Sequence, residues 1–482
     1  MTNAKRPGQV YRRFKPKRWV FVLLVAFGSG VLFWVDDQMK DAPKFNGFHP
    51  ENASWVLQCG NLPRFWLHAQ QTPELQTIAT DRPEIFNRFE LQTRKLTGIR
   101  PSPLRWSIWL GKRMVMAESP EGAGICVYPG LLTRIITSAY QNTIAPNAIN
   151  GVWRVGGIFY GWREGHLIAS NTMLYVQASL NGRRAVAPDR PLTPFEALLS
   201  WGDGLTNQLR VAATEGFPFS GHLTDHFTPR TEPLTLTDAW PSSPLFAVTA
   251  SQWNDMVTAY GQVRGLLSLY DGWTAFESFA SLLWREWQLG ELPPDWEVDA
   301  GISEMTLTIL KVDADEMFPV PDGVLVMRTH NPTTGMDHPL KPLVAPIQAI
   351  PHEWENQPGD YVPLLGEKLS ICLGRNDEDF LAANSEGAMT DALSRLRKGE
   401  SARADLTFRM NWGAMGTAMA AVLRQTAGYE LVPGRNRGEI LESIVPQLEA
   451  MAPLGELTIV GKAQGERLLF QGTLCRSVES AP

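Results

Sequence analysis

One apolar run near the N-terminus constrains this chain more than any other feature. It extends from Trp19 to Val35, and seven basic residues precede it with no acidic residue among them. Two aspartates follow the run. A positive flank beside an apolar stretch is typical of a transmembrane helix whose charged end stays in the cytoplasm. The sequence therefore predicts a basic cytoplasmic tail at residues 1–18, a transmembrane anchor at 19–35, and a body on the other side of the membrane.

A cleaved signal peptide is the alternative explanation of this run. The run has 17 residues, which is at the short end of what crosses a hydrocarbon core of about 30 Å. A signal peptide would have an apolar core of about 7–15 residues followed by a small-residue cleavage site, whereas this run ends in Leu32, Phe33 and Trp34. We therefore expect an uncleaved, single-pass anchor in a bacterial inner membrane, with a periplasmic or extracellular body.

The chain after the anchor is long and acidic. The whole protein carries a formal charge of −6 and the first 35 residues contribute +7, so the remainder carries −13. Nucleic acid selects basic surfaces, so it is not an expected partner. Hydrophobic content of 44% and charged content of 20% are typical of a folded protein, and the length exceeds one ordinary core. We expect a linker at residues 36–50 and two extracytoplasmic units at 51–235 and 236–482.

A strand, a small polar residue and a helix follow one another three times along the body. These segments are Ser54–Leu67, Leu245–Leu267 and Ala404–Gln425, and Ser251 and Asn411 are the predicted helix caps of the last two. The repetition is one of pattern, and it suggests an internal repeat.

Hairpins with a glycine at the turn are the second recurring pattern. They are expected to turn at Gly165, near Gly366 and at Gly465, because glycine supplies the positive φ of a tight turn. A further helix is expected at Pro194–Trp201. Strands joined by hairpins, with helices between them, predict an α+β protein with mainly antiparallel sheets. The pattern allows two similar halves that divide within the stretch Phe227–Pro244.

Four cysteines follow the anchor: Cys59, Cys126, Cys372 and Cys475. No pair has CxxC spacing, so neither a zinc ribbon nor a thioredoxin-type site is indicated. Outside the cytosol, disulfides are permitted. We expect the pairs Cys59–Cys126 and Cys372–Cys475, because each bridge then stays within one half of the chain. Buried free thiols are the alternative.

The segment GHLTDHF is the nearest approach to a metal site. It contains His222, Asp225 and His226, and the spacing of the two histidines would align both rings on one face of a helix. Proline and glycine on both sides argue against a helix there, and solvated loop histidines are the favoured interpretation. We therefore predict no metal site, with these three residues as weak candidates.

No motif for common enzyme chemistry follows the anchor. The sequence lacks the GxSxG elbow of serine hydrolases, the GxxxxGK[ST] phosphate loop and the GxGxxG dinucleotide motif. We therefore expect no cofactor. The 17 tryptophans are explained by core filling, and exposed rings that stack on a glycan are the alternative.

Three segments and the anchor carry a loose resemblance to other proteins. SWVLQCGNLPRFW, REGHLIASN and GERLLFQGTL resemble parts of single-anchor bacterial envelope proteins that are classed as domains of unknown function. The resemblance implies an envelope role and an α+β body, and it transfers no functional residue.

These observations predict a binding or scaffolding role in the bacterial cell envelope. The expected contacts are the membrane, through Trp19–Val35, and an envelope protein or polymer. The alternative is an envelope hydrolase that acts on glycan or peptide with scattered carboxylates and tryptophans. Two carboxylates with raised pKa in a pocket would favour the hydrolase, and an exposed apolar patch would favour binding. A sensor is disfavoured because the cytoplasmic tail is too short for an output domain.

Overall fold

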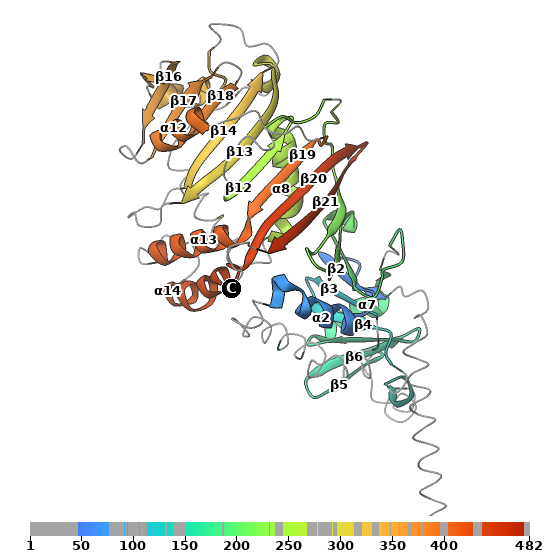
Figure 1. Cartoon of the computed structure of the whole chain (residues 1–482). Coiled ribbons are helices and arrows are strands. Elements are labelled where there is room, and N and C mark those ends of the chain that lie inside the picture. The colour runs from blue at the N-terminus through green and yellow to red at the C-terminus, as the bar shows by residue number, and fades with distance from the viewer. Residues whose placement is uncertain are drawn as a thin grey trace, which may run out of the picture.

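The computed structural model describes residues 47–76, 91, 94, 106, 111, 113–130, 133–137, 150–185, 188–230, 232–236, 244–267, 277, 292, 296–312, 321–329, 337–347, 349–355, 357–364, 369–376, 379–395, 403–427 and 436–476. The predicted α+β class with mainly antiparallel strands is confirmed (Figure 1). The predicted tail and anchor lie outside the described residues. Within the described residues, no helix is both long enough and apolar enough to cross a membrane.

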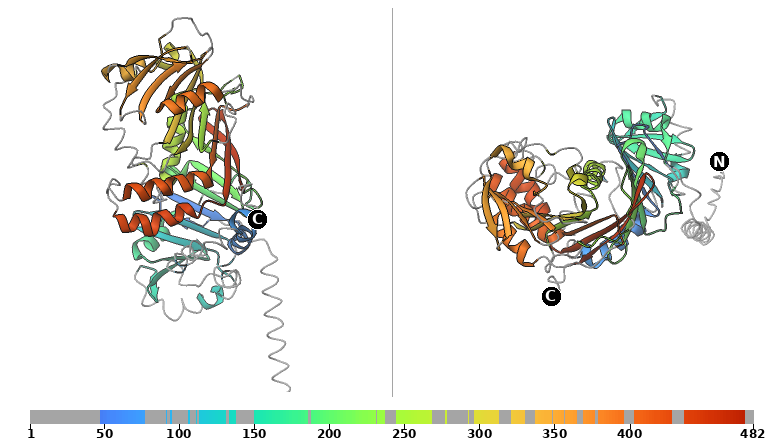
Figure 2. Two further views of the ribbon diagram at one scale, coloured as in Figure 1. Left: turned by 60° about the vertical axis from the view of Figure 1, so that its left-hand side comes forward. Right: turned by 90° about the horizontal axis from the view of Figure 1, so that it is seen from above.

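One antiparallel sheet runs through the whole molecule. Across it, the strands are ordered β5-β6-β7-β4-β3-β2-β9-β10-β11-β21-β20-β19-β12-β13-β14-β18-β17-β16-β15. Among the described strands, β5 and β15 have one partner each and are the two edges. Seen from above, the sheet curves around helix α8 (Figure 2).

The strands of this sheet in the first half are β2 (Trp55–Cys59), β3 (Met114–Ser119), β4 (Gly122–Val127), β5 (Val152–Val155), β6 (Ile158–Arg163), β7 (His166–Ser170), β9 (Glu196–Trp201), β10 (Asn207–Ala212) and β11 (Phe219–Thr224). Those in the second half are β12 (Phe246–Ala250), β13 (Ile302–Val312), β14 (Pro321–Thr329), β15 (Ile350–Trp354), β16 (Gln357–Pro363), β17 (Ser370–Arg375), β18 (Asp379–Ala383), β19 (Leu406–Asn411), β20 (Leu454–Gln464) and β21 (Arg467–Arg476). A separate antiparallel pair is formed by β1 (Phe48–His49) and β8 (Arg183–Arg184).

The helices are α2 (Leu62–Gln71), α7 (Met173–Asn181), α8 (Trp253–Leu267), α10 (Trp296–Asp299), α11 (Lys341–Val344), α12 (Glu386–Arg395), α13 (Trp412–Ala427), α14 (Arg437–Glu439) and α15 (Val445–Glu449). Short 3-10 turns are η2 (Asp203–Leu205) and η3 (Ala345–Ile347), and η4 (Ile440–Ile444) is a π-helical turn.

Two helix caps were predicted, and one of them forms. Asn411 accepts a hydrogen bond from the Ala414 N–H of α13 at 3.0 Å, which confirms that prediction. Ser251 does not cap α8, because its hydroxyl is buried without a hydrogen-bond partner. The first N–H of α8, at Trp253, instead donates to Glu297 of α10 at 3.0 Å. A carboxylate distant in sequence therefore takes the place of the local cap.

The expected helix at Pro194–Trp201 is wrong, because residues from Glu196 onward form β9. This strand lies between β2 and β10, and it is buried at every position except Leu199. An apolar run of this length fits a helix or a central strand equally well from its periodicity. Its two neighbouring strands supply the backbone partners that decide the outcome.

The predicted hairpins at Gly165 and Gly465 form with positive φ at both glycines, whereas the turn near Gly366 lies outside the described residues.

The two halves of the sheet repeat one arrangement of strands. In the first, β2 pairs with β3 and β9, β3 with β4, β4 with β7, β7 with β6, β9 with β10, and β10 with β11. The second half has the same pairings. Its strands correspond to those of the first as follows: β12 to β2, β13 to β3, β14 to β4, β18 to β7, β17 to β6, β19 to β9, β20 to β10 and β21 to β11. We refer to the two halves as the first and second units. They join where β11 pairs antiparallel with β21, so the arrangement has a pseudo-two-fold axis there.

The register at this junction places the same short motif opposite itself. Phe219 and Gly221 on β11 lie opposite Gly472 and Phe470 on β21. Each ring covers the facing glycine, since a Cβ added at Gly472 would lie 2.5 Å from Phe219 and one added at Gly221 would lie 2.7 Å from Phe470. Each strand thus uses the same two residues to contact the other, as in the interface of a symmetric dimer.

Each unit also packs one helix on an equivalent glycine. A Cβ added at Gly161 of β6 would lie 2.8 Å from Val176 of α7, and one added at Gly374 of β17 would lie 3.1 Å from Met389 of α12. Both helices directly follow the strand paired with that glycine. The absence of a side chain on the strand lets the helix approach closely in both units.

At one equivalent position, the two units fill the same space in different ways. In the first unit, Gly124 of β4 lies beneath the buried Tyr175 of α7, and an added Cβ would be 2.3 Å from its ring. In the second unit, the matching strand residue is Val324 and the matching helix residue is Ala388, both fully buried. The large side chain is therefore on the helix in one unit and on the strand in the other.

The second unit has a helical hairpin between β19 and β20, where the first unit has the tight turn η2. Small residues bring α13 close to the chain that follows it. A Cβ added at Gly416 would lie 2.6 Å from the Leu448 carbonyl oxygen, and one added at Gly413 would lie 2.4 Å from that of Leu454. The small residues of α13 thus serve internal packing.

The predicted disulfides are not formed, because all four cysteines are free. Cys59 pairs with Met114, which pairs with Val127, the neighbour of Cys126. Successive side chains point to opposite faces of a strand, so Cys59 and Cys126 lie on opposite faces of the sheet.

The second predicted pair fails because of distance across the sheet. Cys372 on β17 and Cys475 on β21 are separated by β18, β14, β13, β12, β19 and β20. Cys475 is exposed, whereas Cys59, Cys126 and Cys372 are buried. Burial raises the thiol pKa of Cys59 and Cys126 to about 12 and that of Cys372 to about 11, so these three are buried thiols of low reactivity.

Candidate functional site

Buried charged side chains gather where the chain crosses from the first unit to the second. We name the described residues between 227 and 236 the strap. Leu234 and Leu236 of the strap are fully buried. The side chain of Arg230 donates to the carbonyl oxygen of Ser303, the second residue of β13, at 2.9 Å. The strap is therefore part of the folded core of the second unit.

Carboxylates of the second unit accept the backbone N–H groups of the strap. Thr228 N–H donates to Asp255 at 3.2 Å, Arg230 N–H to Asp405 at 2.8 Å and Thr235 N–H to Glu304 at 2.7 Å. All three acids are buried. A buried carboxylate is tolerated only when hydrogen bonds replace the water it has lost, and here the strap supplies them.

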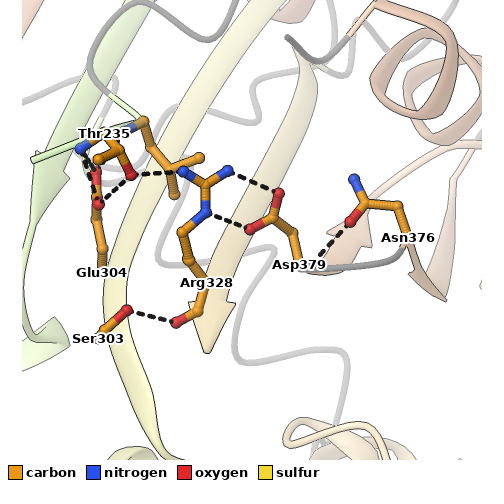
Figure 3. Close-up of polar contacts among 7 residues, drawn as sticks. Thr235, Ser303, Glu304, Arg328, Asn376 and Asp379 are labelled. Atoms are coloured by element: carbon orange, nitrogen blue, oxygen red, sulfur yellow. Dashed lines mark hydrogen bonds and ion pairs between the residues drawn. The ribbon is translucent and has the colours of Figure 1, made fainter. Parts of the chain in front are cut away.

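Glu304 belongs to a longer chain of polar contacts (Figure 3). Its carboxylate also accepts the Thr235 hydroxyl at 2.9 Å. Arg328 donates to that same hydroxyl and makes two further bonds, at 2.8 and 3.0 Å, to the carboxylate of Asp379. The backbone N–H of Asp379 donates to Asn376 at 2.8 Å. Because these groups bind one another and the strap, the network is suited to clamp the strap rather than to bind a substrate.

Three acidic residues, Asp255, Glu297 and Asp405, lie near the beginning of the strap. The pKa of Asp255 is raised to about 6, chiefly by burial and also by the charges of Glu297 and Asp405, while the hydrogen bond from Thr228 acts in the opposite direction. Burial also raises the pKa of Glu297, while the Trp253 N–H acts in the opposite direction. Acids with raised pKa can carry a proton near neutral pH, which is the chemical requirement for general acid catalysis.

The raised pKa of Asp255 makes stability depend on pH. Between its ordinary value of 3.8 and about 6, the folded state binds more protons than the unfolded state, so the free energy of unfolding falls as pH rises through this window. The loss is at most about 3 kcal/mol. Asp255→Asn keeps an acceptor for Thr228, and we expect it to remove this component. Urea denaturation at a series of pH values measures it, and a variant whose pH dependence equals that of the parent would contradict the assignment.

The sequence-predicted candidates His222, Asp225 and His226 do not form a site. His222 lies on β11, where a ring nitrogen is 2.9 Å from the Thr206 carbonyl oxygen. Asp225 accepts from the side chain of Gln262 at 2.8 Å and from the N–H of His226, whose side chain is exposed. His222 lies within β11 and His226 follows the end of this strand, so no helix aligns the two rings. Within the described part of the chain, no three His, Cys, Asp or Glu side chains are grouped to hold a metal ion.

No described helix covers one face of the sheet at the junction of the units (Figure 1). On β20 and β21, exposed and buried residues alternate strictly from Val460 to Gln464 and from Arg467 to Leu469, which shows that one face meets solvent. Figure 1 shows no helix in front of these two strands. We name this surface the central face, and its exposed side chains are Ser220, Val460, Lys462, Leu469, Gln471 and Thr473.

The described tryptophans are buried or half-buried. Trp153 stacks on Tyr160 with ring centroids 6.2 Å apart, and Trp66 meets Trp106 edge to face at 6.0 Å. These contacts agree with core filling, and within the described residues they provide no exposed platform for a sugar ring.

Comparisons with protein-family models, with curated proteins and with solved structures found no match for this chain. The chemistry and geometry of its own residues therefore carry the proposals below.

Proposed function

We propose that this protein is a membrane-anchored, extracytoplasmic binding protein of the bacterial envelope, and that its central face contacts a protein partner. The apolar run at 19–35 with its basic flank supports the anchor. The loose resemblance of three segments to single-anchor envelope proteins supports the compartment.

The central face is the observation that carries the binding role. It combines exposed apolar side chains, Val460 at 41% and Leu469 at 38% exposure, with the polar side chains of Ser220, Gln471 and Thr473. Continuous hydrogen-bonded strands hold these residues on one surface that spans both units. An apolar centre within a polar surround is typical of a protein contact. Glycan sites would favour exposed aromatic rings, which the described part of this face does not contain.

Site-specific photocrosslinking in intact membranes tests the central face. A crosslinking residue in place of Gln471 is expected to form a discrete adduct with one partner. The same substitution at Val257 on α8, which is 49% exposed on the other side of the sheet, is the matched control and is expected to form none. Equal adducts at both positions, or none at Gln471, would contradict the proposal.

An envelope hydrolase is the second candidate, and the raised pKa values of Asp255 and Glu297 favour it. In that case, Asp255→Asn would abolish turnover of a glycan or peptide polymer while the protein stays folded. Under the binding proposal, the parent chain has no such turnover to lose. Hydrolysis of envelope polymers by the purified full chain and by this variant separates the two candidates.

A further inference from the structure

Three arginines contact or pair with β1, the first described strand after the predicted anchor: Arg163, Arg183 and Arg184. A fourth, Arg154, lies over Phe159 of the same unit. We infer that Arg154, Arg163, Arg183 and Arg184, named here the arginine cluster, contact anionic phospholipid headgroups of the membrane that holds the chain. This inference rests on the proposed anchor. It adds a second, electrostatic contact between body and membrane.

Aromatic rings of the first unit position two of these arginines. The Arg163 guanidinium lies 4.0 Å from the centroid of the Phe48 ring and that of Arg184 lies 5.4 Å from it. Arg163 also donates to the carbonyl oxygens of Leu180 and Gly182 at 2.7 and 3.1 Å, so it fixes the end of α7 beside β8. A guanidinium that stacks on a ring in this way can direct its N–H groups at two oxygen atoms of a phosphate. Because the carbonyl oxygens of Leu180 and Gly182 already take up Arg163, the more exposed Arg183 and Arg184 are the main contacts with a headgroup.

The cluster has more positive than negative charge. Glu51 lies 3.4 Å from Arg183, and Glu164 contacts both Arg184 and Arg163. The pairs are exposed, with 70% of the Arg183 side chain and 56% of that of Arg184 in solvent, so the carboxylates hold them weakly. Three guanidinium groups therefore share two carboxylates, and the sequence outside the predicted tail is acidic as a whole.

The length of the chain places this surface near the bilayer. The predicted anchor ends at Val35, and β1 begins at Phe48 and pairs with the two arginines of β8. Residues 36–46 can span at most about 40 Å when fully extended. The linker therefore limits how far β1, and the cluster arginines that pair with it, can lie from the predicted anchor.

The second unit has other residues at the positions of two of these arginines. By strand register, Tyr361 takes the place of Arg154 and Asn376 takes that of Arg163. These two positions therefore do not need arginine for the strands to pair in this way.

The experiment uses the full chain in nanodiscs of phosphatidylcholine, with and without phosphatidylglycerol. Hydrogen exchange of the amides at 47–49 and 183–185 is measured, with the amides of β21 as the internal reference. We expect slower exchange at the first two segments when phosphatidylglycerol is present, and loss of this protection at high salt because the contact is electrostatic.

The test variant is Arg154→Gln with Arg183→Gln and Arg184→Gln, which leaves Arg163 to cap α7. The matched control is Arg403→Gln with Lys311→Gln and Arg437→Gln, which removes the same charge from exposed sites of the second unit. The phosphatidylglycerol-dependent protection should fall about fivefold for each cluster arginine removed and should persist in the control.

Two results would overturn the inference. Equal exchange in both kinds of disc would show that the cluster does not contact anionic lipid, and so would equal behaviour of the test and control variants. Failure of the anchor would look different, because the chain would not enter discs of either composition, and that would refute the anchor and the inference together.

Discussion

Gly124→Val is expected to lower the free energy of unfolding by about 3 kcal/mol, because it forces extra volume into a packed core. The added Cβ would lie 2.3 Å from the ring of Tyr175, which is 1% exposed and cannot move into solvent. Tyr175→Ala alone is expected to cost about 3–5 kcal/mol through the cavity that it leaves. Urea denaturation of the detergent-solubilised full chain measures both values.

The second unit predicts that the two changes compensate each other. It holds Val324 and Ala388 at the equivalent strand and helix positions. The double variant Gly124→Val with Tyr175→Ala should therefore lose about 2 kcal/mol less unfolding free energy than the two single variants lose together. Val324→Gly with Ala388→Tyr is the reverse exchange and should show coupling of the same sign. Additive single effects in both units would show that the units are alike in strand order only.

Local sequence patterns were sufficient for the class and for several elements. Alternating apolar residues predicted β19, and Asn411 ahead of a small-residue helix predicted the start of α13. Glycine at a turn predicted the hairpins at Gly165 and Gly465. These features depend on neighbours in the chain, so the sequence alone contains the information.

Features that depend on distant strands could not be predicted in this way. The apolar run of β9 is compatible with a helix or a strand, and its pairing with β2 and β10 makes it a strand. The cysteine pairing assumed that closeness in sequence means closeness in space, whereas strand register places Cys59 and Cys126 on opposite faces. The motif F-x-G-x-L occurs at 219–223 and at 470–474, and it is too short to be recognised as a repeat from the sequence. The strand register, which places Phe219 opposite Gly472, shows that the two copies are equivalent.

The strap was missed for the same reason. Asp255, Glu304 and Asp405 are three acids among the 50 acidic residues of the chain, and nothing nearby in sequence marks them. They form a set only because they come together where the strap passes. One weak signal was present, because Asp405 stands next to the alternating strand that follows it. An acid at the margin of a buried strand requires a partner.

Arg328→Met is expected to cost about 3–5 kcal/mol of stability, because it leaves a buried carboxylate without its counterion. The Asp379 side chain is 4% exposed and receives two hydrogen bonds from Arg328, at 2.8 and 3.0 Å. The same guanidinium holds the hydroxyl of Thr235 in the strap. Loss of the arginine should therefore also speed hydrogen exchange at Thr235 and Leu236, whose N–H groups donate to Glu304.

The double variant Arg328→Met with Asp379→Leu distinguishes a buried ion pair from general damage to the core. Removing both charges should restore most of the lost stability, to within about 1–2 kcal/mol of the parent. Lys341→Met is the control, since Lys341 pairs with Asp337 at 3.0 Å on the surface, and it should cost less than about 1 kcal/mol. A double variant no more stable than Arg328→Met would show that the cost lies in lost packing. The strap would then be held by its buried leucines and by Glu304, and the Arg328–Asp379 pair would not be needed to clamp it.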